Sequence, residues 1–455
     1  MSAWVLMGLL GSIFLYGLGQ VWISIGLWIG TIGAWVFVAP RLRRYAIVAQ
    51  DSITLPQFLS NRFQTEKPTL RVASAVIFFG GILPLRSVLH LCVRATVSYA
   101  DSHRVANRCD DYGGHCDSGV HPAWRVQCRL LDGLLSRDAD ARRFDDCALR
   151  CPEGAEHFRQ FRNGIHPDNY YNLLAGGEWN WKSISAILTG LGWGLGYAAM
   201  PHILVRYMAI KSEKEMKKSQ IIGSCWTGLI LLMATAVALV AHEFLGDTLA
   251  EADRNLVFVK VVRSIFADGG WAILGGILIS DIVAASMSTA DSQLLAASSA
   301  FSSDIYKTLS KKKVSDRKMI SVGRWAVVAV SLAAFALALL VHLLQLGGVM
   351  ELVSAAWSIF GAAFGPTVLL ALYWKRFTVQ GACAAILSGF GVSVVWMVLF
   401  HLENYGFRSL VADSGIYEIV PGFFFSLLTG WLVSKKTQPN EEAMRVFDRA
   451  MTYRD

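Results

Sequence analysis

Charged residues are scarce in this sequence, and long apolar runs take their place. Of its 455 residues, 17% are charged and 54% are hydrophobic, and the mean hydropathy is +0.43. Soluble domains carry about 25% charged residues. The composition therefore excludes an ordinary soluble protein and predicts an all-α polytopic membrane protein in a lipid bilayer. The net charge of +8 is a weak hint of nucleic-acid binding. Lys and Arg gathered in short cytoplasmic loops explain it better, so we expect no nucleic-acid partner.

Motifs that carry catalysis are missing as well. The sequence has no nucleophile–base constellation, no phosphate-binding loop and no HExxH. The two carboxylates Asp281 and Asp291 are spaced so that they point to different faces of a helix. We therefore expect no enzyme and no cofactor.

A basic segment is absent from the first residues, MSAWVLMGLL, which predicts no cleavable signal peptide. This start is more typical of the middle of a membrane helix. A shorter helix is expected at 255–266. Apolar spans long enough to cross about 30 Å of hydrocarbon are predicted at 3–18, 21–39, 70–85, 184–205, 221–241, 272–300, 320–344, 352–374, 382–400 and 419–433.

Basic and acidic residues separate into different loops. The stretch 242–254 is acidic, and 401–417 has almost no Lys or Arg. From Arg206 onward the loops alternate as the positive-inside rule requires. This predicts a cytoplasmic C-terminus with an amphipathic tail at 437–455 that carries no identifiable chemistry. The basic loops are expected at 41–44, 206–218, 307–324, 375–376 and 435–436.

A helix of small residues is predicted over 281–307, with the sequence DIVAASMSTADSQLLAASSAFSSDIYK. Small side chains bury little area in a soluble core, but they let membrane helices approach closely. Two adjacent hydroxyls, Ser288 and Thr289, lie within this helix. A dehydrated hard cation would satisfy such oxygens. The alternative, that each hydroxyl bonds back to its own helix, stays open.

Glycines alternate through residues 188–202, LTGLGWGLGYAAMPH, inside an otherwise apolar span. Each costs a helix interior about 1 kcal/mol relative to alanine, so a break is expected, and Pro201 adds a kink. Secondary transporters place substrate at such breaks. Trp193 and Tyr197 would share a helix face and suit a small zwitterion with an apolar body. A tightly packed glycine helix is an equal alternative.

Residues 86–164 interrupt the pattern because they are dense in Arg, Asp, His and Cys. Three interpretations are open. A zinc site would need paired ligands about two to four residues apart, and only Cys147 with Cys151, or His115 with Cys116, come near. External disulfides are a second possibility. The third, which we favour, is a stretch translated out of frame.

The frame interpretation can be tested by back-translation. Shifted by one base, residues 121–137 can spell TLLGGFSAVSWTDFFQG, and 86–91 can spell VLYFTF, an apolar continuation of the preceding helix. The tryptophan codon at Trp124, followed by an arginine codon, must give glycine in the shifted frame.

Several motifs together resemble the sodium:solute symporter family, and within it the sodium/proline symporters. The resemblance covers residues 1 to about 85 and about 167 to 436. The motifs are MSAWVLMGLLGSIFLYGL, SITLPQFL, GWGLGYAAMPHILVRYMA, the small-residue helix, WSIFGAAFGPTVLLALYW and YEIVPGF.

The resemblance implies an inverted five-helix-repeat fold that works by alternating access. It also implies a sodium site formed by the Met1 and Ala285 carbonyls and the Ser288 and Thr289 hydroxyls. Ser2 matches a position that the family associates with sodium and substrate. Trp193 and Tyr197 match substrate-pocket positions. The implied function is import of L-proline, or a similar amino acid, with sodium across the cell membrane.

The sequence also departs from the family. The family has a further N-terminal helix and, just before the position of Met1, an aspartate-ended half helix; neither precedes Met1 here. We therefore expect four parts: an incomplete N-terminal membrane part (1–85), the out-of-frame stretch (86–164), a membrane core (165–436) and the tail (437–455). As written, the polypeptide is expected not to transport. The alternative is a membrane receptor or sensor with a genuine Cys/His-rich insert.

Overall fold

The computed structural model describes residues 4–49, 52, 54–65, 69–101, 169–174, 177–246, 251–266, 271–310, 314–344, 349–401 and 410–453. Within these ranges the chain is helical and contains no strand, as predicted from its composition. The first half comprises η1 (Val5–Leu9), α1 (Leu10–Tyr16), η2 (Leu18–Gln20), α2 (Val21–Gly33), η3 (Ala34–Val38), α3 (Ala39–Val48), α4 (Leu55–Arg62), α5 (Thr69–Asp101), α9 (Trp181–Gly192), η6 (Trp193–Ala198) and α10 (Pro201–Met208).

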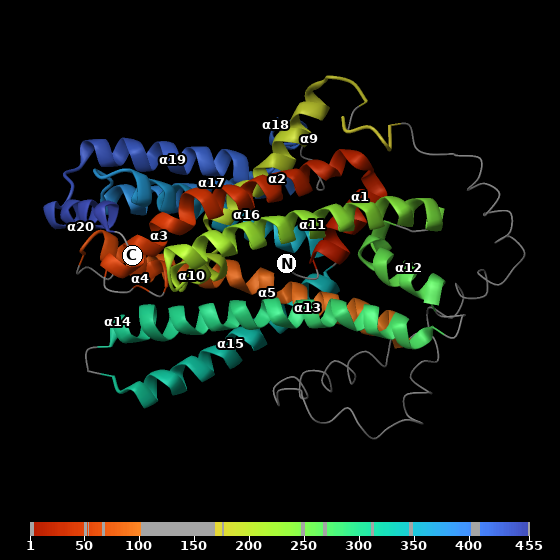
Figure 1. The fold of residues 1–455 in the computed structure, drawn as a ribbon, viewed down its shortest axis with the longest axis horizontal. Helices are drawn as coiled ribbons and strands as arrows, with labels where there is room; N and C mark the ends of the chain where they lie inside the picture. The colour runs from red at the N-terminus through yellow and green to blue at the C-terminus, as the bar shows by residue number, and fades with distance from the viewer. Residues whose placement is uncertain are drawn as a thin grey trace, which may run out of the picture.

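The remaining helices complete a bundle whose long members run roughly along one axis (Figure 1). They are α11 (Glu213–Leu245), η8 (Glu251–Leu256), α12 (Val257–Phe266), α13 (Ala272–Ser299), η9 (Ala300–Tyr306), α14 (Lys307–Leu309), α15 (Asp316–Leu343), α16 (Val349–Tyr373), α17 (Val379–His401), α18 (Leu410–Ser414), α19 (Ile419–Lys436) and α20 (Glu441–Thr452).

Ten membrane spans were expected from the sequence. Among the described residues, seven helices are long and apolar enough to cross a membrane, or eight if α9, η6 and α10 form one broken span. The expected span at 419–433 forms the helix α19 but is not among them. The predicted first span corresponds to the shorter apolar helix Val5–Tyr16. The short helix expected at 255–266 is α12.

The helix α16 lies at the centre of the bundle, packed against α5, η6, α17 and α19. Of the residues in its apolar stretch, 72% are buried, whereas only 17% are buried in the apolar stretch of the span Ala272–Leu309, which contains α13. Small residues on α16, such as Gly361, Ala362 and Gly365, allow this close packing on several sides. The small-residue helix α13 instead lies at the edge of the described bundle and packs on α5 and α15.

The expected end of the third span at residue 85 was too early. The helix α5 continues to Asp101 and so includes the first part of the polar stretch. Its continuation buries Val88, Cys92 and Val93. Apolar residues at helical spacing therefore sustain the helix past Arg86. The other cysteines and histidines of the stretch, from His103 to His157, lie outside the described residues.

The expectation that residues 41–44 form a loop was wrong, because these residues lie within α3. The Arg41 guanidinium lies 3.8 Å from the ring centroid of Tyr373 and donates to the Leu372 carbonyl. Arg43 donates to the Met208 carbonyl at 2.8 Å. Both acceptors lie in the last turn of a neighbouring helix, where carbonyls lack intrahelical partners. These contacts let the arginines remain helical.

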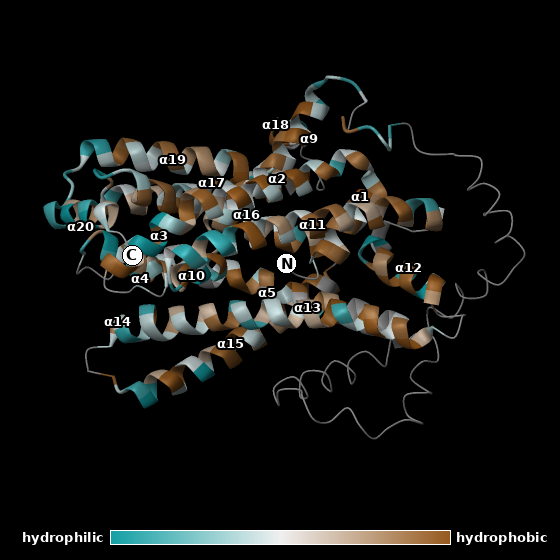
Figure 2. Cartoon of the chain, in the orientation of Figure 1, coloured by the Kyte–Doolittle hydropathy of each residue, from teal (hydrophilic) through white to brown (hydrophobic). Residues whose placement is uncertain are grey.

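Hydrophilic residues gather at one end of the bundle, around α3, α10, α14 and α20 (Figure 2). The basic stretches identified in the sequence meet here, since Arg43 contacts α10 and Lys375 pairs with Asp448 of α20 at 2.7 Å. The acidic loop that contains η8 lies beside α1 and α12, toward the opposite end (Figure 1). The two ends of the bundle therefore differ in charge.

The tail folds as the amphipathic helix α20, which packs against α3 and α4. Its apolar face covers Arg62, which is fully buried. The Arg62 guanidinium donates to the carbonyls of Ala371 and Ala443, which lie on α16 and α20. Burial lowers the pKa of this guanidinium. Arg62 therefore joins the tail to the end of the central helix.

We expect Arg62→Met to destabilise the protein by about 2–4 kcal/mol, because several buried carbonyls would lose their donor. Protection of the tail against proteolysis should fall together with the thermal midpoint in detergent. Lys375→Ala is the matched control: it removes an exposed tail contact, whose partners are 45% and 57% exposed, and should cost under about 1 kcal/mol. Equal losses in the two variants would contradict the role given to Arg62.

Candidate functional site

The span that carries the alternating glycines is broken, as predicted. Between α9 and α10 the residues Trp193–Ala198 form a 3₁₀ segment, and the axis bends by 46° before α10 begins at Pro201. Pro201 occupies the first turn of α10, where its missing N–H leaves no hydrogen bond unmade. The break therefore follows directly from the glycine and proline pattern.

The glycines also serve close packing, which was the alternative interpretation. A Cβ on Gly194 would collide with the Gly26 carbonyl, and one on Gly30 would collide with Gly194. The helix α2 and the segment η6 therefore touch backbone to backbone. The 3₁₀ segment η6 is packed inside the protein rather than exposed. Backbone that departs from the α-helix is tolerated in a membrane only where it is buried in protein or lines a cavity.

Trp193 lies at the centre of an aromatic cluster. Its indole is buried and stacks between Trp4 and Tyr417, with ring centroids 5.1 Å away on each side. The Trp357 Nε1 donates to the Trp193 carbonyl at 2.8 Å. Tyr197 meets Trp357 edge to face at 5.4 Å. We call Trp4, Trp193, Tyr197, Trp357 and Tyr417 the aromatic cluster.

Trp193 and Tyr197 belong to one cluster but do not share a face in the way expected for an α-helix. In a 3₁₀ helix residues three apart eclipse one another, so residues four apart diverge. Trp357, reaching from α16, contacts both rings instead. Because η6 is a 3₁₀ helix, the side chains of Trp193 and Tyr197 leave it in different directions. The ring of Trp357 contacts both.

The sodium candidates on α13 lie within one turn of each other. The Thr289 hydroxyl donates to the Ala285 carbonyl at 3.1 Å, while Ser288 is exposed. Thr289 therefore hydrogen-bonds to its own helix, which was the alternative to sodium binding. Donating this bond leaves the lone pairs of the Thr289 oxygen free to accept. Met1 and Ser2, the other candidates, lie outside the described residues.

A side-chain contact joins the broken span to α13. Arg206, on α10, donates to the Ser292 hydroxyl at 2.7 Å, and Ser292 donates to the Ser288 carbonyl. The aromatic cluster and the α13 oxygens are therefore separate groups connected through α10. Over the residues that the structure describes, no group of His, Cys, Asp and Glu could hold a metal ion.

Sequence reasoning assigned no role to Trp4, Trp357 or Tyr417. Trp357 precedes a run of small residues, GAAFG, where a large ring has space to reach a neighbouring helix. Tyr417 is held by its hydroxyl, which donates to the Ser354 carbonyl at 2.6 Å. The sequence offers little indication of a role for Tyr417, because its contacts with Ser354 and Trp193 join parts of the chain that are far apart in sequence.

Known proteins match almost the whole chain. The profile of the Sodium:solute symporter family matches residues 1–83 and 154–389. The high-affinity proline transporter PutP of Bacillus subtilis (strain 168) is 35% identical over 471 residues, covering 100% of this chain and 91% of the relative. The osmoregulated proline transporter OpuE of the same organism is 31% identical, covering 98% and 87%.

A third relative is sodium/proline symporter 2 of Staphylococcus saprophyticus, which is 32% identical and covers 96% of this chain and 83% of the relative. Among solved structures, a Na⁺-coupled sialic acid symporter in a substrate-bound outward-open state aligns with a TM-score of 0.63. It has 16% identity and covers 96% of this chain and 88% of that one. At this identity the likeness concerns the fold alone.

Proposed function

The chain belongs to the sodium:solute symporter family, and from this premise we propose that it imports L-proline into the cell together with sodium ions. The observation that supports the proposal most directly is the aromatic cluster on a broken membrane helix. The break between η6 and α10 interrupts regular helix and so places polar backbone groups near the rings, which offer apolar faces. A small amphiphilic zwitterion such as proline needs both.

Trp193 and Tyr197 are proposed to line the substrate site, with Ser2 near both ligands. The Trp193 ring is already held between two aromatic neighbours, which fixes its orientation. A fixed ring loses little side-chain entropy when substrate binds. Because neighbouring rings cover the faces of Trp193, the apolar pyrrolidine ring would pack against the edge of Trp193 and the ring of Tyr197. The charged groups of proline would be oriented by polar backbone groups.

Sodium is proposed to bind the Ala285 carbonyl and the hydroxyls of Ser288 and Thr289, with the Met1 carbonyl opposite. All four ligands are neutral oxygens, a chemistry that suits a hard cation. Their neutrality would keep binding weak enough for release into a cytoplasm poor in sodium. Coupling follows if sodium and proline stabilise the same conformation. Apart from this coupling ion, the proposal invokes no cofactor.

The chain is a multi-pass membrane protein, and we place it in the cell membrane with its C-terminus in the cytoplasm. The basic stretches of the sequence, set against the acidic stretch 242–254, support this orientation. We also retain the interpretation that the gene for residues 86–164 is read out of frame. The family profile leaves residues 84–153 unmatched, and that interpretation stays a prediction.

Uptake of labelled L-proline into proteoliposomes tests the function. Two chains are compared under an inward sodium gradient and under an equal potassium gradient: the chain as given, and one in which the frame over 86–164 is restored. Sodium-dependent uptake by either chain supports the proposal. If neither chain takes up proline, although both reconstitute and remain folded, the proposal fails.

The contact between Arg206 and Ser292 gives a prediction about coupling. Arg206→Met should raise the sodium concentration for half-maximal uptake by about threefold, because an exposed contact of a charged group is worth under about 1 kcal/mol. Lys211→Met, in the connection to α11, is the matched control and should leave that concentration unchanged. Identical curves for Arg206→Met and the unmodified chain would show that the contact carries no coupling.

A further inference from the structure

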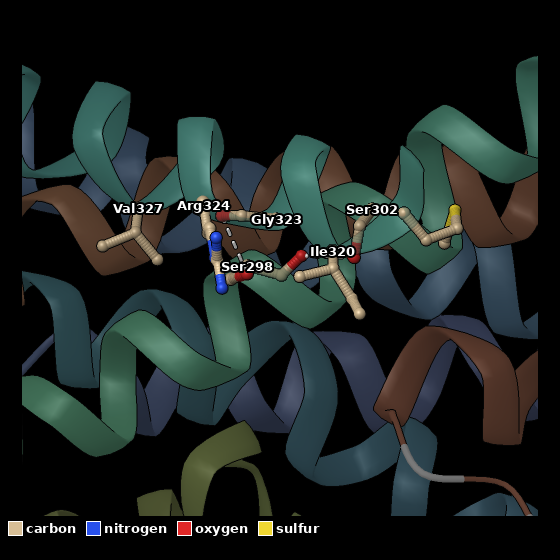
Figure 3. Close-up of a pocket in the computed structure, with 7 residues that line it drawn as sticks. Ser298, Ser302, Ile320, Gly323, Arg324 and Val327 are labelled. Atoms are coloured by element: carbon tan, nitrogen blue, oxygen red, sulfur yellow. Dashed lines mark hydrogen bonds between the residues drawn. The ribbon is translucent and has the colours of Figure 1, made fainter. Parts of the chain in front are cut away.

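A groove of about 360 Å³ lies between α13 and α15, toward the basic end of the bundle. The two helices cross closely here because the Ser298 hydroxyl donates to the Gly323 carbonyl at 3.0 Å. A Cβ on Gly323 would lie 2.8 Å from the Ser298 oxygen, so a larger residue there would displace this hydroxyl. The groove opens beside the crossing point (Figure 3).

The walls of the groove are amphiphilic. Ser298 and Ser302 supply hydroxyls, and Met319, Ile320 and Val327 supply apolar surface. Arg324 reaches from α15 to lie beside Ser298 (Figure 3). Both hydroxyls already donate to backbone carbonyls, so Arg324 is the donor that remains for a ligand. A cation with an apolar wall alongside matches an anionic headgroup with an acyl chain.

The surroundings of the groove are strongly basic. The exposed side chain of Trp325 follows Arg324 directly, as expected near a membrane interface. Within the described ranges, Arg324 has no ion-pair partner. Among the described residues of the segment 307–324, Asp316 is the one acidic residue, and the cations are Lys307, Arg317, Lys318 and Arg324.

We propose that this groove binds one anionic phospholipid of the leaflet that faces the basic end, with its phosphate on Arg324 and its acyl chain along α15. Basic pockets between membrane helices on the cytoplasmic side bind such headgroups, and juxtamembrane Lys and Arg add about 1 kcal/mol each. The Arg324 guanidinium offers a planar pair of donors to phosphate oxygens. The bound lipid would pack across the crossing of α13 with α15. This binding does not depend on the proposed transport.

Lipid retention by the full-length protein tests the proposal. The protein is purified from membranes that contain phosphatidylglycerol and phosphatidylcholine, and the lipid that stays bound in detergent is quantified by native mass spectrometry. We expect one phosphatidylglycerol per chain, retained at least about fivefold less by Arg324→Ala, which loses about 1 kcal/mol. Arg324→Lys should fall between the two, because it keeps the charge but loses the planar donors.

Arg317→Ala is the matched control, since it removes one exposed cation of the same segment outside the groove, and its retention should change by less than about twofold. Equal losses in the Arg317 and Arg324 variants would mean diffuse surface attraction and would overturn the proposal. Displacement of the lipid by excess inorganic phosphate would also overturn it, because the groove would then be a site for free anions. Retention of phosphatidylcholine in equal amount would do the same.

Discussion

Alanine at both Ser288 and Thr289 should make proline uptake independent of a sodium gradient and reduce it to background. Each change removes one neutral oxygen from a site that has few. Losing one ligand oxygen should raise the sodium concentration for half-maximal uptake by about tenfold, which corresponds to about 1.4 kcal/mol. The measurement is initial uptake against sodium concentration, in whichever chain transports proline, as given or with its frame restored.

Two further variants separate ion binding from structure. Thr289→Ser keeps the hydroxyl and should restore most of the sodium dependence. Ser280→Ala removes an exposed hydroxyl elsewhere on α13, one that bonds only to its own helix, and should leave uptake unchanged. If Ser280→Ala behaved like the double variant, packing of α13 rather than sodium ligation would explain the loss.

Most of the membrane spans could be predicted, because length and hydropathy largely decide which segments cross hydrocarbon. The residues at which those spans end could not be predicted, and the arginines at 41–44 show why. They read as a loop by charge, yet carbonyls at the ends of α10 and α16 accept their hydrogen bonds and keep them helical. Those acceptors lie far away in the sequence. Pro40 lies just after the π segment η3, where the regular hydrogen-bond ladder is already interrupted.

In the candidate site, too, the local features could be predicted and the tertiary contacts could not. Alternating glycines and Pro201 predicted the break in the span, since their backbone preferences are local. The pattern could not show that the segment would wind as a 3₁₀ helix and so separate the rings of Trp193 and Tyr197. The partner rings Trp357 and Tyr417 come from α16 and from the turn before α19. Only tertiary packing brings them together.

The sodium candidates depend more on family resemblance than on geometry. Within α13 the structure places Ala285 and Thr289 in one hydrogen bond and leaves Ser288 exposed. The opposite wall of the proposed site would come from Met1, outside the described residues. The role of these oxygens is therefore a proposal that the substitutions above test.

Restoring the reading frame over residues 86–164 should convert the chain from background uptake to sodium-driven uptake of proline. The stretch as given is dense in Arg and Asp, and each charged side chain at the centre of a bilayer costs at least about 2.5–3.5 kcal/mol. The shifted frame can instead spell apolar sequence at 86–91 and TLLGGFSAVSWTDFFQG at 121–137. The restored segment would then be able to supply membrane helices to the bundle.

A fresh nucleotide read across the codons for 86–164 is the first measurement, followed by uptake with the chain as given and with the restored chain. Single-base errors bracketing the stretch, with uptake confined to the restored chain, would support the interpretation. If the frame stands as given and that chain itself takes up proline, the interpretation is wrong. The Cys/His-rich stretch would then be a genuine insert, and bound zinc or a protease-resistant fragment spanning 86–164 should be found.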